Sequence, residues 1–110
     1  MLKRGFLYWA HLDKRRPVLV LSPQARNEGA NDVIVIPVSS VLREGPWHVR
    51  LQAKEGGIQK TSILKCEQIL TLPKSSIKDE PLGPILFASR MKQVEHAVLR
   101  AIGMPVADER

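Results

Sequence analysis

The sequence predicts a mainly β protein that ends in one helix. Two observations favour this class: short apolar runs separated by turn residues dominate up to about residue 73, and apolar residues at helical spacing follow near the C-terminus. Five or more short strands in a chain of 110 residues favour closure of the sheet, because closure removes edges that would otherwise be exposed. We therefore expect a small antiparallel barrel with a C-terminal helix.

Five segments carry strand signals. Residues 5–12 alternate and hold three aromatic residues, residues 17–21 are apolar, and residues 33–38 are largely β-branched. Residues 47–51 alternate, and residues 62–72 are long enough for two short strands or one strand that bends near its middle. The connections contain Asn-Glu-Gly, Glu-Gly-Pro and Glu-Gly-Gly, which are typical of turns.

A helix is expected from Ser89, as its N-cap, to Gly103, which would end it. Residues 104–110 have little to bury and are expected to form a short flexible tail. One domain is therefore expected over residues 1–103. The apolar stripe that should pack on the core comprises Met91, Val94, Val98, Ala101 and Ile102.

The chain is strongly basic. Seventeen Lys and Arg residues against eleven Asp and Glu give a formal net charge of +6 and a pI near 9.9, which favours a polyanionic partner, nucleic acid first. The single Cys66 cannot form an intrachain disulfide, and no N-terminal run has the order of a signal peptide, so a cytoplasmic protein is expected. No apolar run approaches the roughly 18 residues that cross a bilayer, so no membrane partner is expected.

No metal or other cofactor is expected. His11, His48 and His96 stand far apart without a partner at helical spacing, and one cysteine provides no zinc pair. Cys66 lacks a signature that would pair it with a base. The glycines at 56–57 lack the length and the following Lys-Ser/Thr of a phosphate-binding loop.

Arg16 and Pro17 open an apolar strand. Proline fixes its own φ and favours an extended conformation in the residue before it, so Arg16 is expected at a rigid strand entrance. That position suits a residue that grips a phosphate, and it equally suits a surface arginine on any strand edge.

Four further polar residues stand where strands begin or end, namely Ser39, Ser40, Lys65 and Glu67. Strand alternation would place Lys65 and Glu67 on one face, as a surface ion pair or as an acid and a base. Metal-free RNA cleavage needs a group that removes the 2′-hydroxyl proton, a donor for the leaving 5′-oxygen, and positive charge beside the phosphorane. Glu, Arg and Lys can fill these roles.

The order of several segments along the chain is recognisable. They are Arg4-Gly5 with Tyr8-Trp9, Arg16 to Ser22, Val35 to Ser40, Glu67-Gln68-Ile69 with Thr71, and a terminal amphipathic helix ending in Gly103. In this order they closely resemble the MazF/PemK (Kid) toxins of bacterial toxin–antitoxin systems. The resemblance covers roughly residues 4–103.

The resemblance implies a metal-independent, sequence-selective endoribonuclease that cuts single-stranded RNA and inhibits growth by destroying messages. It implies a homodimer of SH3-like barrels, with RNA in a groove across the dimer interface. It also implies a cognate antitoxin with an acidic flexible segment that competes with RNA, and it allows contact with operator DNA through that antitoxin.

By the resemblance, Arg16 occupies the position of the family's catalytic arginine and Ser39 that of its catalytic threonine. Lys65 and Glu67 match the Arg and Asp of an Arg-Cys-Asp-Gln stretch to which acid and base roles are assigned. Glu67 or, alternatively, Ser39 would assist removal of the 2′-hydroxyl proton, which yields a 2′,3′-cyclic phosphate and a 5′-hydroxyl.

Three departures from the family pattern bear on activity. Phe6 stands where relatives usually carry an acidic residue, and only residues 13–15 separate Leu12 from Arg16, where relatives carry a long loop and one branch a histidine. Lys65 also replaces a planar guanidinium with a point charge, which weakens bidentate contact with phosphate.

Basic and aromatic side chains elsewhere are expected to bind RNA by phosphate contact and base stacking. Trp9 or Trp47 could stack on bases, although an aromatic residue in the position of Trp9 is more typical of a core. The expected RNA-binding residues are Lys14, Arg15, Ser40, Arg43, Trp47, Arg50, Lys54 and Gln68.

Two other functions remain open from the sequence. A non-catalytic nucleic-acid-binding barrel, or degenerate toxin, would bind RNA and leave it intact, and the short first loop favours it. A DNA gyrase poison is the other, since the related CcdB toxins share the barrel, but the Arg-Pro and Ser-Ser motifs argue against it. RNA cleavage and supercoiling assays discriminate the three.

Overall fold

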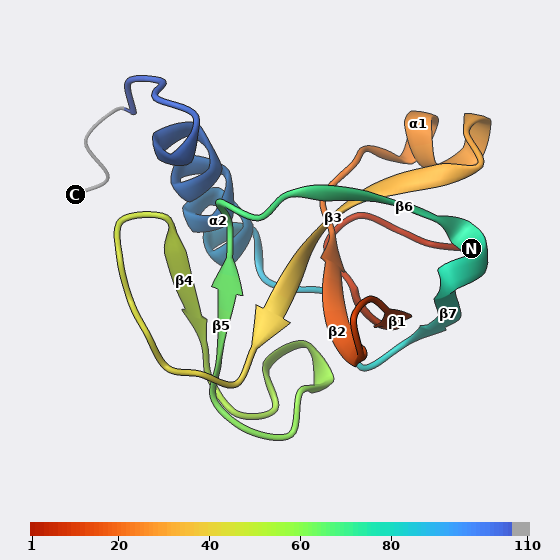
Figure 1. Cartoon of the computed structure of the whole chain (residues 1–110), viewed down its shortest axis with the longest axis horizontal. Coiled ribbons are helices and arrows are strands. Elements are labelled where there is room, and N and C mark those ends of the chain that lie inside the picture. The colour runs from red at the N-terminus through yellow and green to blue at the C-terminus, as the bar shows by residue number, and fades with distance from the viewer. Residues whose placement is uncertain (107–110) are drawn as a thin grey trace.

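The computed structural model describes residues 1–106 and has seven strands and two helices (Figure 1). Two short 3₁₀ turns lie at Glu55–Gly57 and Lys74–Ser76. The strands are β1 (Leu7–His11), β2 (Arg15–Val20), β3 (Asp32–Ser39), β4 (His48–Leu51), β5 (Ser62–Lys65), β6 (Leu70–Pro73) and β7 (Ile77–Pro81); the helices are α1 (Gln24–Gly29) and α2 (Ala88–Ala101).

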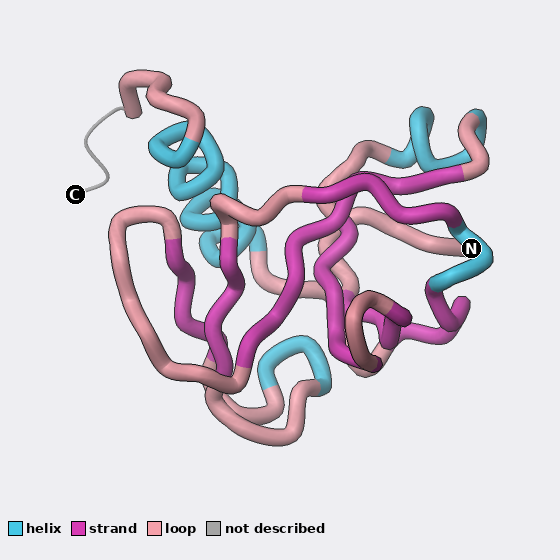
Figure 2. The backbone as a smooth tube through the Cα atoms, in the orientation of Figure 1, coloured by secondary structure: helices cyan, strands magenta, loops and turns pink. Residues whose placement is uncertain are grey.

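One antiparallel sheet runs in the order β4-β5-β3-β2-β1-β7, and β6 pairs with the first half of β3. Strand β3 is the centre of this arrangement, because β6 and β5 occupy successive parts of the same edge while β2 occupies the other. Figure 2 shows the strongly curved path that results. The mainly β class with a C-terminal helix is confirmed, and the shape is barrel-like.

The expected full closure of the sheet does not occur among the described residues. The order ends at β4 on one side and at β7 on the other. Strand β7 protects its edge with the exposed charged residues Lys78, Asp79 and Glu80 and ends at Pro81, and such residues discourage edge-to-edge pairing. Charged side chains and a proline therefore protect this edge from pairing, in place of a further strand.

Two buried clusters form the core. Helix α2 packs on the β4–β5 side through Met91, Val94 and Ala97, and this cluster also buries Cys66. The second cluster lies under β1, β2, β3 and β6. It consists of Leu2, Tyr8, Ala10, Val18, Val20, Val33, Val35, Leu72 and Ile77.

The segment at 62–72 forms two strands separated by a turn, which is one of the two expected arrangements. Strand β7 contradicts the expected change to a helical pattern after residue 73. Only Ile77 of that strand is buried, so the sequence carries no alternation there. Helix α1 was also not expected; it is short, and its Asn27 side chain is buried in hydrogen bonds with Ser22.

The N-cap of helix α2 lies two residues before the expected Ser89. The N-cap is Phe87, which makes no side-chain capping bond. Gly103, with φ of 81°, ends the helix as expected, since this left-handed conformation favours glycine. Ile102 lies outside the core with 63% of its surface exposed, because it follows the last helical turn.

Of the tail at 104–110, residues 107–110 lie outside the described residues. Within residues 1–106, no helix is long and apolar enough to cross a membrane.

Candidate active site

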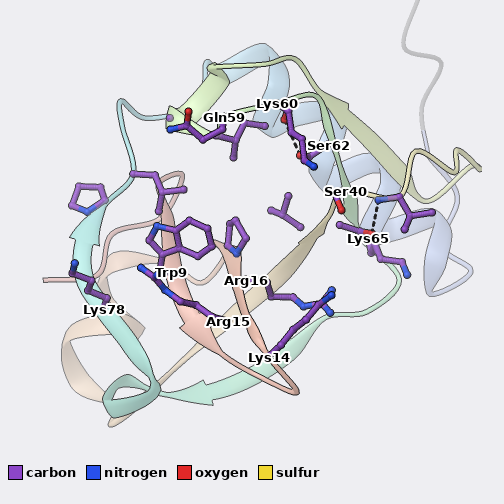
Figure 3. A pocket seen from close by; sticks show the side chains of 18 of the residues that line it. Trp9, Lys14, Arg15, Arg16, Ser40, Gln59, Lys60, Ser62, Lys65 and Lys78 are labelled. Atoms are coloured by element: carbon purple, nitrogen blue, oxygen red, sulfur yellow. Dashed lines mark hydrogen bonds between the residues drawn. The ribbon is translucent and has the colours of Figure 1, made fainter.

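A cavity of about 710 Å³ opens between the start of β2, the end of β3 and the connection that links β4 to β5 (Figure 3). This volume lies within the range of about 300–1,000 Å³ that is usual for ligand pockets. The lining comprises Trp9, Lys14, Arg15, Arg16, Pro17, Val38, Ser39, Ser40, Val41, Gly57, Ile58, Gln59, Lys60, Ser62, Lys65, Lys78, Glu80, Pro81 and Leu82.

Arg16 lies at the second position of β2, where it pairs with Ala10 of β1. Its side chain is only 23% exposed, and its Nη2 lies 3.3 Å from a carboxylate oxygen of the exposed Asp13. The buried Nε has no hydrogen-bond partner among the described residues. A buried N–H donor without a partner is costly, so an anionic ligand in the cavity would supply a missing acceptor.

Ser39 and Ser40 reach the same cavity from the end of β3. Ser39 is buried, and its Oγ accepts a hydrogen bond from the Val41 backbone N–H at 3.1 Å. Because a hydroxyl both accepts and donates, the hydrogen of Ser39 remains available for a ligand. Ser40 is exposed at the rim.

Lys65 and Glu67 separate, contrary to the expected placement on one strand face. Strand β5 ends at Lys65, which lines the cavity, and the chain turns at 66–67. Glu67 is outside the lining, and its Oε2 lies 3.1 Å from Nε2 of His48 at the start of β4. The alternation rule fails here because it holds only within a continuous strand.

Some of the expected RNA-binding residues line the cavity, and the others lie outside it. Lys14, Arg15 and Ser40 line the cavity. Arg50 lies on the other side of β4 and donates a hydrogen bond to Glu44 at 2.6 Å, which lowers the pKa of Glu44 and raises that of Arg50. Four others lie outside the cavity lining, namely Arg43, Trp47, Lys54 and Gln68.

Several lining residues were not expected from the sequence. Gln59, Lys60 and Ser62 come from the β4–β5 connection and the start of β5, and Lys78 and Glu80 come from the unexpected β7. Because the four residues of β7 after Ile77 are all exposed, no alternation in the sequence could have identified Lys78 and Glu80. Six of the lining residues are Lys or Arg and one, Glu80, is acidic, so the cavity is strongly positive.

Within residues 1–106, no group of three or more His, Cys, Asp or Glu side chains is placed to hold a metal ion. Burial, reinforced by the charge of Glu67, raises the pKa of Cys66 to about 12, so its thiol stays protonated near neutral pH.

The fold and this cavity define a class: a small basic β protein that gathers cations, hydroxyls and an unpartnered arginine donor around one positively charged cavity. Over residues 3–102 the sequence matches the model of the PemK-like, MazF-like toxins of type II toxin–antitoxin systems. The chain belongs to this family.

Individual relatives agree with that assignment. Endoribonuclease MazF of Staphylococcus epidermidis is 28% identical over 114 residues, which cover 94% of this chain and 93% of that protein. Together with the family match, this similarity identifies the chain as a toxin with endoribonuclease activity.

Solved structures confirm the fold. Mycobacterium tuberculosis toxin MazF-mt6 superposes with a TM-score of 0.83 at 26% identity, covering 92% of this chain and 99% of that one. A MazE-MazF structure from Deinococcus radiodurans superposes with a TM-score of 0.79 at 28% identity, covering 94% and 97% of the two chains.

Proposed function

We propose that the cavity around Arg16 is the active site and that it cleaves single-stranded RNA, messages included, at selected sequences without a metal ion. The convergence of Arg16, Ser39 and Lys65 on one positive cavity carries this proposal. These three residues come from β2, β3 and β5, and a phosphodiester held between them would meet donors from three strands.

The reaction is an internal transesterification. The 2′-oxygen attacks phosphorus, the bond from phosphorus to the 5′-oxygen breaks, and a 2′,3′-cyclic phosphate and a 5′-hydroxyl result. The proton lost by the 2′-hydroxyl is balanced by the proton gained at the 5′-oxygen, so no water is consumed. The transition state carries extra negative charge on the phosphorane oxygens, and fixed cations stabilise it.

Each residue has a role that follows from its position. The unpartnered Nε and the guanidinium of Arg16 hold the scissile phosphate; with a pKa above about 12, this group acts electrostatically. Lys65 supplies a second positive charge and, as an ammonium, can donate to the leaving oxygen. Ser39 Oγ accepts the 2′-hydroxyl proton while its own hydrogen passes to a phosphate oxygen, so the proton acceptor lies within the cavity. Glu67, which bonds to His48 outside the cavity, is assigned a positioning role at the end of β5.

The first experiment uses purified protein and mixed-sequence single-stranded RNA in excess chelator, with mapping of the fragment ends. Cuts at a short recurring sequence with cyclic-phosphate ends are expected. They should vanish in Arg16→Ala and persist in Arg26→Ala, since Arg26 lies outside the cavity and pairs with Asp32. Normal cleavage of a strand with one 2′-deoxy sugar at the cut site would contradict the mechanism.

A non-catalytic RNA binder is the second candidate, and one observation favours it. Only three residues, 12–14, connect β1 to β2, so little chain is available to cover a bound substrate. RNA that remains intact while binding is retained would support this candidate.

We propose three further properties on the same basis. A cognate antitoxin with an acidic flexible segment occupies the positive cavity and links the toxin to operator DNA. A structure of a relative from Deinococcus radiodurans contains both MazE and MazF, which supports an antitoxin partner. The active form is a homodimer with RNA across its interface. The protein acts in the cytoplasm, where its substrate is. Light scattering and competition of an acidic peptide with RNA test the first two properties.

A further inference from the structure

Trp9 lies at the cavity and outside both core clusters. Its neighbours along β1 are buried, with Leu7 in the cluster under α2 and Tyr8 and Ala10 in the other. Trp9 itself is half-buried, belongs to neither cluster and lines the cavity beside Arg16 (Figure 3). Core packing therefore does not account for this large aromatic side chain.

Arg15 covers the Trp9 ring. The guanidinium carbon of Arg15 lies 4.4 Å from the ring centroid, and within residues 1–106 no carboxylate pairs with Arg15. A cation held over an aromatic ring is attracted by the negative face of that ring. We refer to Trp9 and Arg15 together as the stacking shelf; it presents a planar, positively charged surface to the cavity that Arg16, Ser39 and Lys65 also line.

Gln59 belongs to the opposite wall and is held there by the core. Ile58, the residue before it, is buried, and the Lys54 backbone N–H donates to the Ile58 carbonyl at 2.7 Å. Gly57, with φ of 94°, packs so closely on the Leu82 carbonyl that a Cβ would lie 2.2 Å from the oxygen. The wall is therefore fixed in place before any ligand arrives.

We propose that the stacking shelf and Gln59 form a binding site for one unpaired RNA base adjacent to the scissile phosphate. This inference rests on the proposed function and adds a specificity site to it. Unpaired bases stack on aromatic rings and guanidinium planes, and a glutamine amide offers both a donor and an acceptor to a base edge. The shelf would thus supply affinity, and Gln59 would supply discrimination between bases.

The test measures binding of short, uncleavable 2′-O-methyl single strands in which an abasic site replaces each nucleotide in turn. Trp9→Leu is compared with the wild type and with Trp9→Phe, which keeps an aromatic face. In a Trp47→Phe background Trp9 is the sole tryptophan, so quenching of its fluorescence reports stacking directly. Thermal unfolding of each variant checks that the fold is retained.

The expected result is coupling at one position of the strand. There the abasic site should weaken binding by the wild type and Trp9→Phe about fivefold to 150-fold, the range of base–aromatic stacking, and weaken Trp9→Leu by less than twofold. Gln59→Ala should bind the four bases at that position about equally. Equal abasic effects in the wild type and Trp9→Leu at every position would overturn the proposal.

The two proposals fail separately in this design, because the strands used for binding cannot be cleaved. Coupling at one position together with intact ordinary RNA would remove the ribonuclease mechanism and keep the base site. Cleavage of ordinary RNA without coupling at any position would remove the base site and keep the mechanism.

Discussion

The two sides of the β4–β5 hairpin use the same kinds of charged residue in different ways. On the side of α2 the cations are paired, as where Arg90 binds Glu55 at 2.6 and 3.0 Å and where Arg4 meets Glu95. On the cavity side, Arg16 lies near Asp13 and Lys78 near Glu80, but no carboxylate among the described residues pairs with Lys14, Lys60 or Lys65. Paired cations hold the helix in place, whereas unpaired cations keep their charge for a ligand.

The sharpest test of this difference is at two residues that are separated by one position. Lys65→Met should lower the cleavage rate roughly 100-fold, because it removes a cation from the cavity, whereas Glu67→Gln should lower it less than about tenfold. Single-turnover cleavage with saturating RNA measures both. A larger loss of cleavage rate in Glu67→Gln would mean that the Glu67 carboxylate takes part in the reaction itself.

The paired side should respond in stability. Arg90→Ala removes the bidentate, partly buried bond to Glu55 and should lower the free energy of unfolding by about 2 kcal/mol. Urea unfolding followed by circular dichroism measures this value. The cleavage rate of the variant, at a temperature well below the unfolding transition, should stay within about twofold of the wild-type rate. A large loss of activity in folded Arg90→Ala protein would contradict the separation of roles between the two sides.

Cys66 makes the helix side sensitive to alkaline pH. Burial raises the pKa of its thiol from 9.0 to about 12. The unfolded chain loses this proton first, so stability is fully present below pH 9 and falls between pH 9 and 12, by up to about 1.4 kcal/mol per pH unit. Urea unfolding at several pH values should show a steeper decline for the wild type than for Cys66→Ala; parallel curves would contradict the assignment.

The smallest expected effect concerns salt. Lys60→Ala should reduce the log–log salt slope of single-strand binding by about 0.7, because one phosphate contact is lost. Lys92→Ala on α2 is the matched control and should leave the slope unchanged, since Lys92 lies away from the cavity. Equal slopes for the two variants would mean that charge acts through the whole molecule, with no preference for the cavity.

The sequence predicts best where one residue type has one physical use. The β-branched run at 33–38 and the terminator Gly103 were placed correctly, because packing and a left-handed φ leave few alternatives. Strand β7 was missed because it buries only Ile77, and its pairing with β1 depends on contacts distant in sequence. The hydrophobic pattern within a short segment carries no information about which distant strand that segment pairs with.

The candidate site was predictable at Arg16, Ser39 and Lys65, which share the cavity as the family resemblance implies. The resemblance could not place Glu67, since its direction depends on where β5 ends and on the buried His48 across the hairpin. The cavity wall at Gln59 could not be predicted from the sequence either, because it depends on the close approach of Gly57 to Leu82. The sequence therefore predicted cavity-lining residues that stand at a strand end, and it missed those whose place depends on tertiary contact.

The residues that line the cavity are spread over most of the chain, so the cavity can form only late in synthesis. Its walls begin at Trp9 and are completed only by β7 and Leu82, and the central strand β3 needs both later neighbours, β5 and β6, before its edge is filled. A chain still being translated has no assembled cavity until most of it has left the ribosome. A ribonuclease built in this order cannot attack the message from which it is being made until its own translation is nearly finished.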